Sequence, residues 1–107
     1  MTAQMHQAKI EQLQLLEQGL HALSSQRQEL EAKQLEADAV ISQLVSQPVS
    51  YKVIGNIMVK ADSATLVEDL KQIKESAIIR IKSIEKQEQN MKVKAKDLQA
   101  EVMKGMM

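Results

Sequence analysis

Two stretches of seven-residue repeats, separated by a single break, most constrain what this chain can fold into. Before Pro48, mostly apolar residues recur every seven positions in two rows. The first row is Leu16, Leu23, Leu30, Ala37 and Leu44, and the second is Leu13, Leu20, Arg27, Gln34 and Ile41. After Asp62 the corresponding rows are Leu70, Ala77, Ile84, Met91 and Leu98, and Val67, Lys74, Ile81, Glu88, Ala95 and Val102. Repeats of this length indicate a coiled coil rather than a surface helix of a globular protein.

Polar residues interrupt both repeats. They are Arg27, Gln34, Lys74 and Glu88. The favoured interpretation is that these side chains extend along the helices to solvent. The alternative is that they fix the register of the two helices, as single polar residues do in other coiled coils.

The composition agrees with an elongated helical chain. There is one Tyr and no Phe, Trp or Cys among 107 residues, and 14 basic residues balance 14 acidic ones. A globular core of this size usually packs around several aromatic side chains. No apolar run is long enough to cross a membrane, and without Cys there is no disulfide framework, thiolate metal site or thiol nucleophile. We therefore expect one soluble, cytoplasmic, mostly α domain over residues 1–107.

Three short signals divide the chain. Pro48 disfavours helix at the preceding residue, so the first helix should end near Ser46 and span 1–46. Gly55-Asn56 is a turn dipeptide inside the connector 47–61. The second helix, 62–104, begins at the Asp62-Ser63 cap or at a box starting at Thr65. Two helices of matched length joined this way should pack antiparallel.

The connector is rich in β-forming residues, and it predicts a β-hairpin of 51–54 and 57–60. Apolar side chains fall on both faces, because successive strand residues point to opposite sides. A lone hairpin is marginally stable and its edges invite pairing. We expect hairpins of several chains to join in an intermolecular β-barrel; the alternative is one hairpin stabilised by its own helices. The residues expected to drive this oligomerisation are Tyr51, Val53, Ile54, Gly55, Ile57, Met58 and Val59.

Methionines gather near both ends of the chain, which antiparallel helices would bring together. Met is adaptable and is frequent on surfaces that accept many partners. One interpretation is a client-binding tip; the other, equally open, is a ragged tail. The residues of the predicted tip are Met1, Met5, Ile10, Val102, Met103, Met106 and Met107.

The sequence carries no convincing catalytic, metal or cofactor motif. His6 and His21 have no further ligand pair beside them, and Ser83-x-x-Lys86 lacks the cleft and oxyanion hole that a hydrolase needs. No Gly-rich loop is present for a nucleotide, and the lysines at 92, 94 and 96 spread around the helix without aromatic neighbours. We expect no enzyme activity, no cofactor and no binding to nucleic acid or membranes.

The order helix–hairpin–helix resembles the prefoldin family, in its archaeal β-type form. The resemblance covers essentially the whole chain. Its most specific part is the run Y-K-V-I-G-N-I-M-V-K at 51–60, followed by E-D-L at 68–70 and R-I-K-S-I-E-K-Q-E at 80–88.

This resemblance implies a hexamer of two α-type and four β-type subunits, with pooled hairpins as its body and six coiled-coil tentacles. It implies an ATP-independent holdase that captures unfolded proteins at the tentacle tips and passes them to a group II chaperonin. The family likeness places assembly on 51–60 and capture on the terminal regions. The competing hypothesis is a structural coiled-coil adaptor or spacer that assembles through its hairpin.

Overall fold

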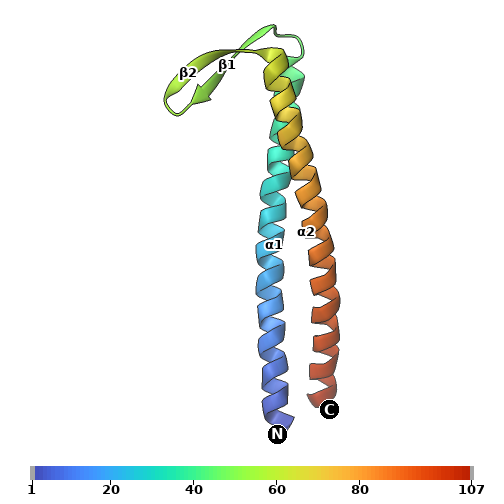
Figure 1. The fold of residues 1–107 in the computed structure, drawn as a ribbon. Coiled ribbons are helices and arrows are strands. Elements are labelled where there is room, and N and C mark those ends of the chain that lie inside the picture. The colour runs from blue at the N-terminus through green and yellow to red at the C-terminus, as the bar shows by residue number, and fades with distance from the viewer. Residues whose placement is uncertain (1, 107) are drawn as a thin grey trace. The chain divides into compact units, whose positions relative to one another are not determined.

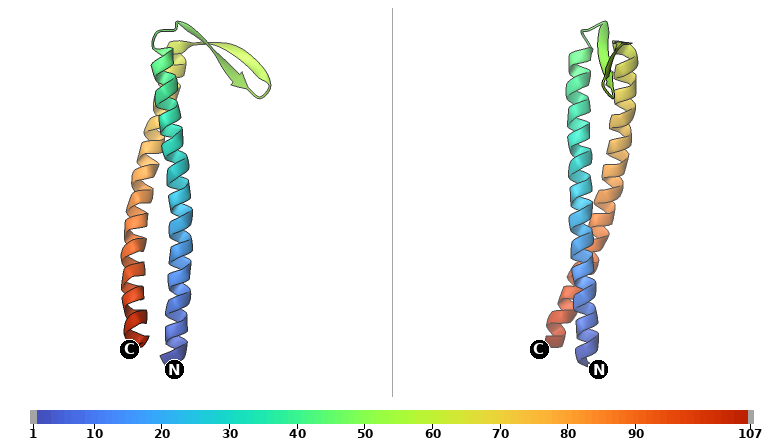
Figure 2. Two further views of the ribbon diagram at one scale, coloured as in Figure 1. Left: turned by 180° about the vertical axis from the view of Figure 1, so that it is seen from behind. Right: turned by 90° about the vertical axis from the view of Figure 1, so that its left-hand side faces the viewer.

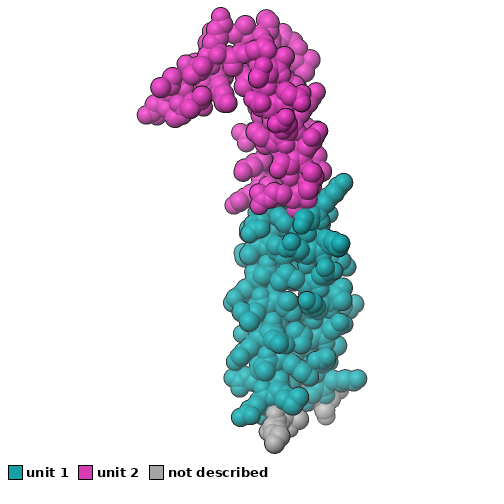
Figure 3. Space-filling model, in the orientation of Figure 1, with its two compact units in different colours: residues 1–28, 82–107 teal, residues 29–81 magenta. Residues whose placement is uncertain are grey.

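The structure is a computed structural model that describes residues 2–106. Its elements follow in the order α1 (Thr2–Leu44), β1 (Val49–Ile54), β2 (Ile57–Asp62) and α2 (Ser63–Met106), as Figure 1 shows. The chain forms two compact units, coloured in Figure 3. Unit 1 contains residues 1–28 and 82–107, and unit 2 contains residues 29–81. Neither helix contains an apolar stretch that is long enough to cross a membrane, within the residues described.

Unit 1 is a pair of antiparallel helical segments, one from α1 and one from α2 (Figure 2). Every position of the predicted rows that falls in this unit is buried or half-buried. Ile84, Glu88 and Val102 are the most shielded. The repeat therefore does mark the contact between the two helices.

Unit 2 continues the same pattern and adds the hairpin. Its seam buries Leu30 and Ala37 from α1 against Ala77 and Ile81 from α2. Lys74, one of the polar seam residues, reaches the carboxylate of Asp38 with an Nζ–Oδ1 distance of 2.6 Å. The small side chains of Ala37 and Ala77 are buried in this seam, which allows the two helices to approach closely.

The two strands form an antiparallel hairpin with Ile54 paired to Ile57 next to the turn and Val49 paired to Asp62 at the far end. Gly55 has a φ of 61°, whereas no other residue of the described chain has a positive φ. Positive φ at the first central residue alone is the pattern of a type II′ turn, which matches the twist of the flanking strands.

The element boundaries differ from the predicted ones by one or two residues. α1 ends at Leu44 rather than near Ser46, and the Gln47 amide donates to the Leu44 carbonyl at 3.0 Å. Each strand is two residues longer at its outer end than the runs 51–54 and 57–60. Of the two predicted starts for α2, the structure has the earlier one, with Asp62 preceding the helix and accepting a hydrogen bond from the Thr65 hydroxyl at 3.2 Å.

Ser63 fixes the hairpin to the start of α2. Its side chain is buried, its amide donates to the Pro48 carbonyl at 3.4 Å, and its hydroxyl lies 2.6 Å from that of Ser50. These two contacts hold the beginning of the connector against the first residue of α2. This arrangement identifies the face of the hairpin that carries Ser50 as the face turned toward the helices of unit 2.

Candidate assembly and client-binding surfaces

Both faces of the hairpin are uncovered in the chain by itself. The pairing register places Tyr51, Val53 and Met58 together on the outer face. It places Ile54, Ile57 and Val59 together on the face that is turned toward the helices. The exposed fractions are 57–67% for Tyr51, Val53, Ile54, Ile57 and Met58, and 42% for Val59. Exposed apolar patches of this kind are typical of surfaces that another protein covers.

The edges of the hairpin are open as well. The sheet of the described chain has two strands only, so the outer side of each strand presents N–H and C=O groups without a strand partner. Such edges readily accept a further strand. Strand addition would satisfy these groups, and stacking against other hairpins would cover the apolar side chains.

In unit 1, the beginning of α1 lies beside the end of α2. Lys9 and Glu101 form an ion pair at 3.2 Å between Nζ and Oε2. The His6 ring lies against Gly105, where a Cβ atom would come within 2.9 Å of Nδ1. The absence of a side chain at Gly105 therefore gives the His6 ring its place against α2.

The predicted tip residues do not share one environment. Met5 and Met103 are about 60% exposed, at 62% and 60%, and present flexible thioether side chains to solvent. Ile10 is half-buried. Met1 and Met107 lie outside the described residues, and so does the side chain of Met106.

Val102 requires a correction. Its side chain is 9% exposed, because it occupies a position of the α2 repeat that faces α1. It stabilises the helix pair in unit 1 and is not part of the exposed tip. The same repeat that predicted the coiled coil contains this information, since Val102 falls in the row that includes Ala95 and Glu88.

Two of the polar interruptions of the seam require a correction. Arg27 does not extend freely to solvent: its Nε donates to Oε1 of Glu88 at 2.7 Å, and the Glu88 side chain is 8% exposed. Lys74 pairs with Asp38, but these two side chains are 34% and 43% exposed, which agrees with a lysine that extends toward solvent. The alternative interpretation, in which polar residues fix the register, fits the Arg27–Glu88 contact better.

Comparison with known proteins identifies the family. A family model described as "Prefoldin subunit" matches residues 7–107. The chain is 35% identical over 96 residues to the prefoldin subunit beta of Methanothrix thermoacetophila, covering 87% of this chain and 80% of that protein. It is 30% identical over 99 residues to the prefoldin subunit beta of Thermococcus kodakarensis, covering 90% and 85%. This chain belongs to the prefoldin subunit family.

The fold agrees with a solved prefoldin structure. The crystal structure of the prefoldin beta subunit from Thermococcus strain KS-1 superposes with a TM-score of 0.83 at 29% identity, covering 94% of this chain and 90% of that one. The resemblance to a β-type prefoldin and the predicted fold class, two long helices around a central antiparallel hairpin, are confirmed. Membership of a chaperone family also confirms the expected chaperone function.

Two exposed apolar residues near the hairpin were not singled out from the sequence. Val40 and Ile73 are exposed apolar residues that fall outside both rows of the repeat, and they lie on the helices of unit 2 next to the hairpin. The sequence signal that could have identified Val40 and Ile73 is an apolar residue at a helix position outside the heptad rows. Within residues 2–106 no group of three or more His, Cys, Asp or Glu side chains is placed to hold a metal ion.

Proposed function

We propose that this chain is a β-type subunit of a hetero-hexameric, ATP-independent chaperone, with two α-type and four β-type subunits. Its hairpin joins the other subunits through Tyr51, Val53, Ile54, Ile57, Met58 and Val59, with Gly55 forming the turn. The observation that most supports assembly through the hairpin is that both of its faces and both of its edges are uncovered in the chain alone. Burying them in a barrel shared by several chains removes this apolar surface from water.

The client-binding surface of this proposal is the exposed thioether surface near the helix ends, with Met5 and Met103 as its described members. Single contacts of this kind are weak and tolerant of shape. Several subunits holding one unfolded chain would add their contacts without ordering the client. Release to a group II chaperonin in the cytoplasm then requires only that the chaperonin compete for the same apolar client segments.

The experiment for capture is an aggregation assay without nucleotide. The assembled hexamer is mixed with a chemically unfolded enzyme, and light scattering is followed during dilution from denaturant. We expect suppression near stoichiometric amounts of complex. Undiminished scattering would favour the adaptor or spacer hypothesis.

A matched pair of variants locates the client-binding surface. Met5→Ser with Met103→Ser removes the exposed thioethers, and we expect protection to fall several-fold while the mass of the complex stays unchanged. Leu15→Ser is the control, because Leu15 is also in unit 1 and is 66% exposed. An equal loss in both variants would show that general surface hydrophobicity, and not this location, holds the client.

The chaperonin step has a separate test. A labelled client bound to the hexamer is offered to a purified group II chaperonin, and its transfer is followed by size-exclusion chromatography. We expect the client to elute with the chaperonin. Retention of the client by the hexamer at saturating chaperonin would contradict the delivery step and leave capture intact.

A further inference from the structure

The hairpin is shielded from solvent only at its base. Among residues 49–62, Ser50 and its cross-strand partner Ala61 are half-buried, and every other residue is exposed. Ser63, the residue that follows the hairpin, is 3% exposed. The orientation of the hairpin relative to the helices of unit 2 therefore depends on a few contacts around Ser50.

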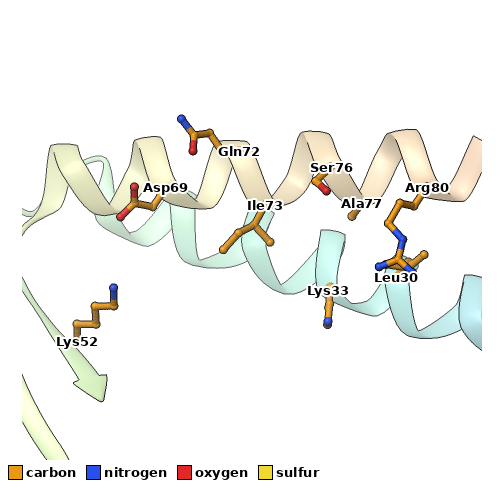
Figure 4. Close-up of a pocket in the computed structure, with 9 residues that line it drawn as sticks. All are labelled: Leu30, Lys33, Lys52, Asp69, Gln72, Ile73, Ser76, Ala77 and Arg80. Atoms are coloured by element: carbon orange, nitrogen blue, oxygen red, sulfur yellow. The ribbon is translucent and has the colours of Figure 1, made fainter. Parts of the chain in front are cut away.

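Beyond this base the hairpin stands apart from the helices. Ser50 and Lys52 line a hollow of about 270 Å³ whose opposite wall includes Leu66 of α2. A second hollow of about 520 Å³ lies between Lys52 and the helix residues Asp69 and Ile73, as Figure 4 shows. Side-chain packing further out along the strands therefore does little to hold the hairpin at one angle.

The two junctions of the hairpin with the helices differ. β2 ends at Asp62 and α2 begins at Ser63, so no linker separates this strand from its helix. Residues 45–48 separate α1 from β1. The hairpin is thus joined most directly to α2, and its first strand follows that helix only through contacts across the junction.

The contact between β1 and α2 is the hydroxyl pair of Ser50 and Ser63. Their oxygens lie 2.6 Å apart, which is within the usual range for an O–H···O hydrogen bond. The Ser63 amide also donates to the Pro48 carbonyl, but at 3.4 Å, which is long for an N–H···O bond. The hydroxyl pair is therefore the stronger of the two contacts at this junction.

Helix capping does not account for the place of the Ser63 side chain. A capping serine accepts a hydrogen bond from a backbone N–H two or three residues further on. Ser63 is already the first residue of α2, and the residue before the helix is Asp62, whose carboxylate accepts from the Thr65 hydroxyl at 3.2 Å. Ser63 thus directs its hydroxyl to the hairpin and not to its own helix.

A small rotation at this base has a large effect further away. Strands rise about 3.3 Å per residue, so a rotation of about 20° would move the turn at Gly55 by roughly 5 Å relative to the helices. With the hairpin held in a shared body, the same rotation would move α2 at Ile81, the last residue of unit 2, by roughly 9 Å, since helices rise about 1.5 Å per residue.

We propose that the Ser50–Ser63 hydroxyl pair fixes the angle between the hairpin and α2, and through it the direction in which the helices of unit 2 leave the assembled body. The inference rests on the proposed assembly through the hairpin. Several client-binding surfaces can hold one client together only if their spacing matches it. Ser50 and Ser63 are therefore positioning residues for capture, which set the spacing of the client-binding surfaces without touching the client.

Two variants at one position isolate the hydroxyl. Ser50→Thr keeps it, whereas Ser50→Val has the same branched shape and also favours a strand but lacks the hydroxyl. The chain has no Cys, so Asn56→Cys and Ile79→Cys place spin labels at the turn and at an exposed position of α2. Double electron–electron resonance on the labelled chain measures the distance between them. We expect the width of the distance distribution to increase about twofold in Ser50→Val and to stay unchanged in Ser50→Thr.

Thr65→Val is the control for the loss of a hydroxyl at the start of α2. It removes the contact with Asp62, which joins residues three apart and does not reach β1. We expect its distance distribution to match that of the parent. A broadening equal to that of Ser50→Val would show that any disturbance of the helix start has this effect, and would overturn the inference.

Hexamers assembled from the unlabelled variants connect the angle with capture. We expect Ser50→Val to leave the mass of the complex unchanged and to lower the protection of a chemically unfolded enzyme about twofold or more. Ser50→Thr should protect like the parent, because it retains the hydrogen bond.

The outcomes separate this inference from the proposed function. If the parent hexamer protects no client, the proposed capture is wrong, whereas the distances in the labelled chain still test the hydroxyl contact. Equal distributions in Ser50→Val and Ser50→Thr would overturn the inference, and so would equal protection by their hexamers. Dissociation of the Ser50→Val complex would show that the pair serves assembly and not direction, which also overturns it.

Discussion

At the scale of residues, the Arg27–Glu88 pair shows how one polar contact can define the alignment of two helices. The pair is shielded from solvent and lies in an otherwise mostly apolar seam of unit 1. A shift by one heptad would place Ile81 or Ala95 opposite Arg27 in place of Glu88. Both charges would then be desolvated without each other, which is costly. We therefore assign the pair a role in register.

Glu88→Leu should lower the free energy of unfolding by about 1–3 kcal/mol, because it leaves the Arg27 guanidinium in the seam without this carboxylate. The double variant Arg27→Leu with Glu88→Leu should recover most of that loss, since an apolar pair of similar size packs well. Thermal unfolding by circular dichroism measures both. A double variant that is less stable than Glu88→Leu would contradict this account.

The exposed pair Lys9–Glu101 provides the control. Its side chains are about a third to a half accessible, so solvent screens their attraction. Replacing both by Gln should change stability by less than about 1 kcal/mol. A larger effect would show that the helix ends depend on this ion pair.

At the scale of elements, the hairpin depends on the backbone conformation of Gly55. No atom lies within 4 Å of a Cβ built at this position, so a substitution meets no steric obstacle beyond its own backbone. Its φ of 61° is the decisive feature, because residues with a Cβ rarely adopt it. The turn therefore requires glycine for its backbone conformation and not for lack of space around the side chain.

Gly55→Ala should destabilise the hairpin by about 1–2 kcal/mol through this conformational cost. Asn56→Ala, at the neighbouring turn position where φ is not positive, should cost clearly less. Hydrogen exchange of the β1 and β2 amides reports the difference directly. Equal exchange rates in the two variants would contradict the assignment of a type II′ turn.

The hairpin also shows how far sequence reasoning reaches. Alternating β-formers around Gly55-Asn56 predict both strands and the turn, because these are local preferences. The contact of Ser50 with Ser63 was not predicted, since it depends on how the hairpin leaves the helix ends in three dimensions. The heptad rows predict the seam, but they do not reveal that Glu88 is buried with Arg27 rather than turned to solvent.

At the scale of the whole molecule, the proposed determinants of assembly and of client capture belong to different units. The hairpin is part of unit 2, and Met5 and Met103 are part of unit 1. Variants in one unit should therefore leave the activity of the other largely intact. The proposed tip was only partly predicted: Val102 falls in a row of the α2 repeat and is buried, whereas Met103 lies outside both rows and is exposed.

Replacing Val53 and Ile57 by Lys tests that separation, because it places charges on both faces of the hairpin. We expect the complex to dissociate into its subunits while the helices stay folded, since neither residue contributes to the seam. Circular dichroism and analytical ultracentrifugation measure the two properties. Loss of helix together with loss of assembly would show that the units are interdependent.

Native mass spectrometry at micromolar concentration, on the chain with and without its α-type partner, tests the dependence on shared hairpins most directly. We predict a hexamer in the mixture, and hydrogen exchange at residues 49–62 that slows when it forms. A stable monomer in both samples, with its hairpin amides already protected, would contradict the account.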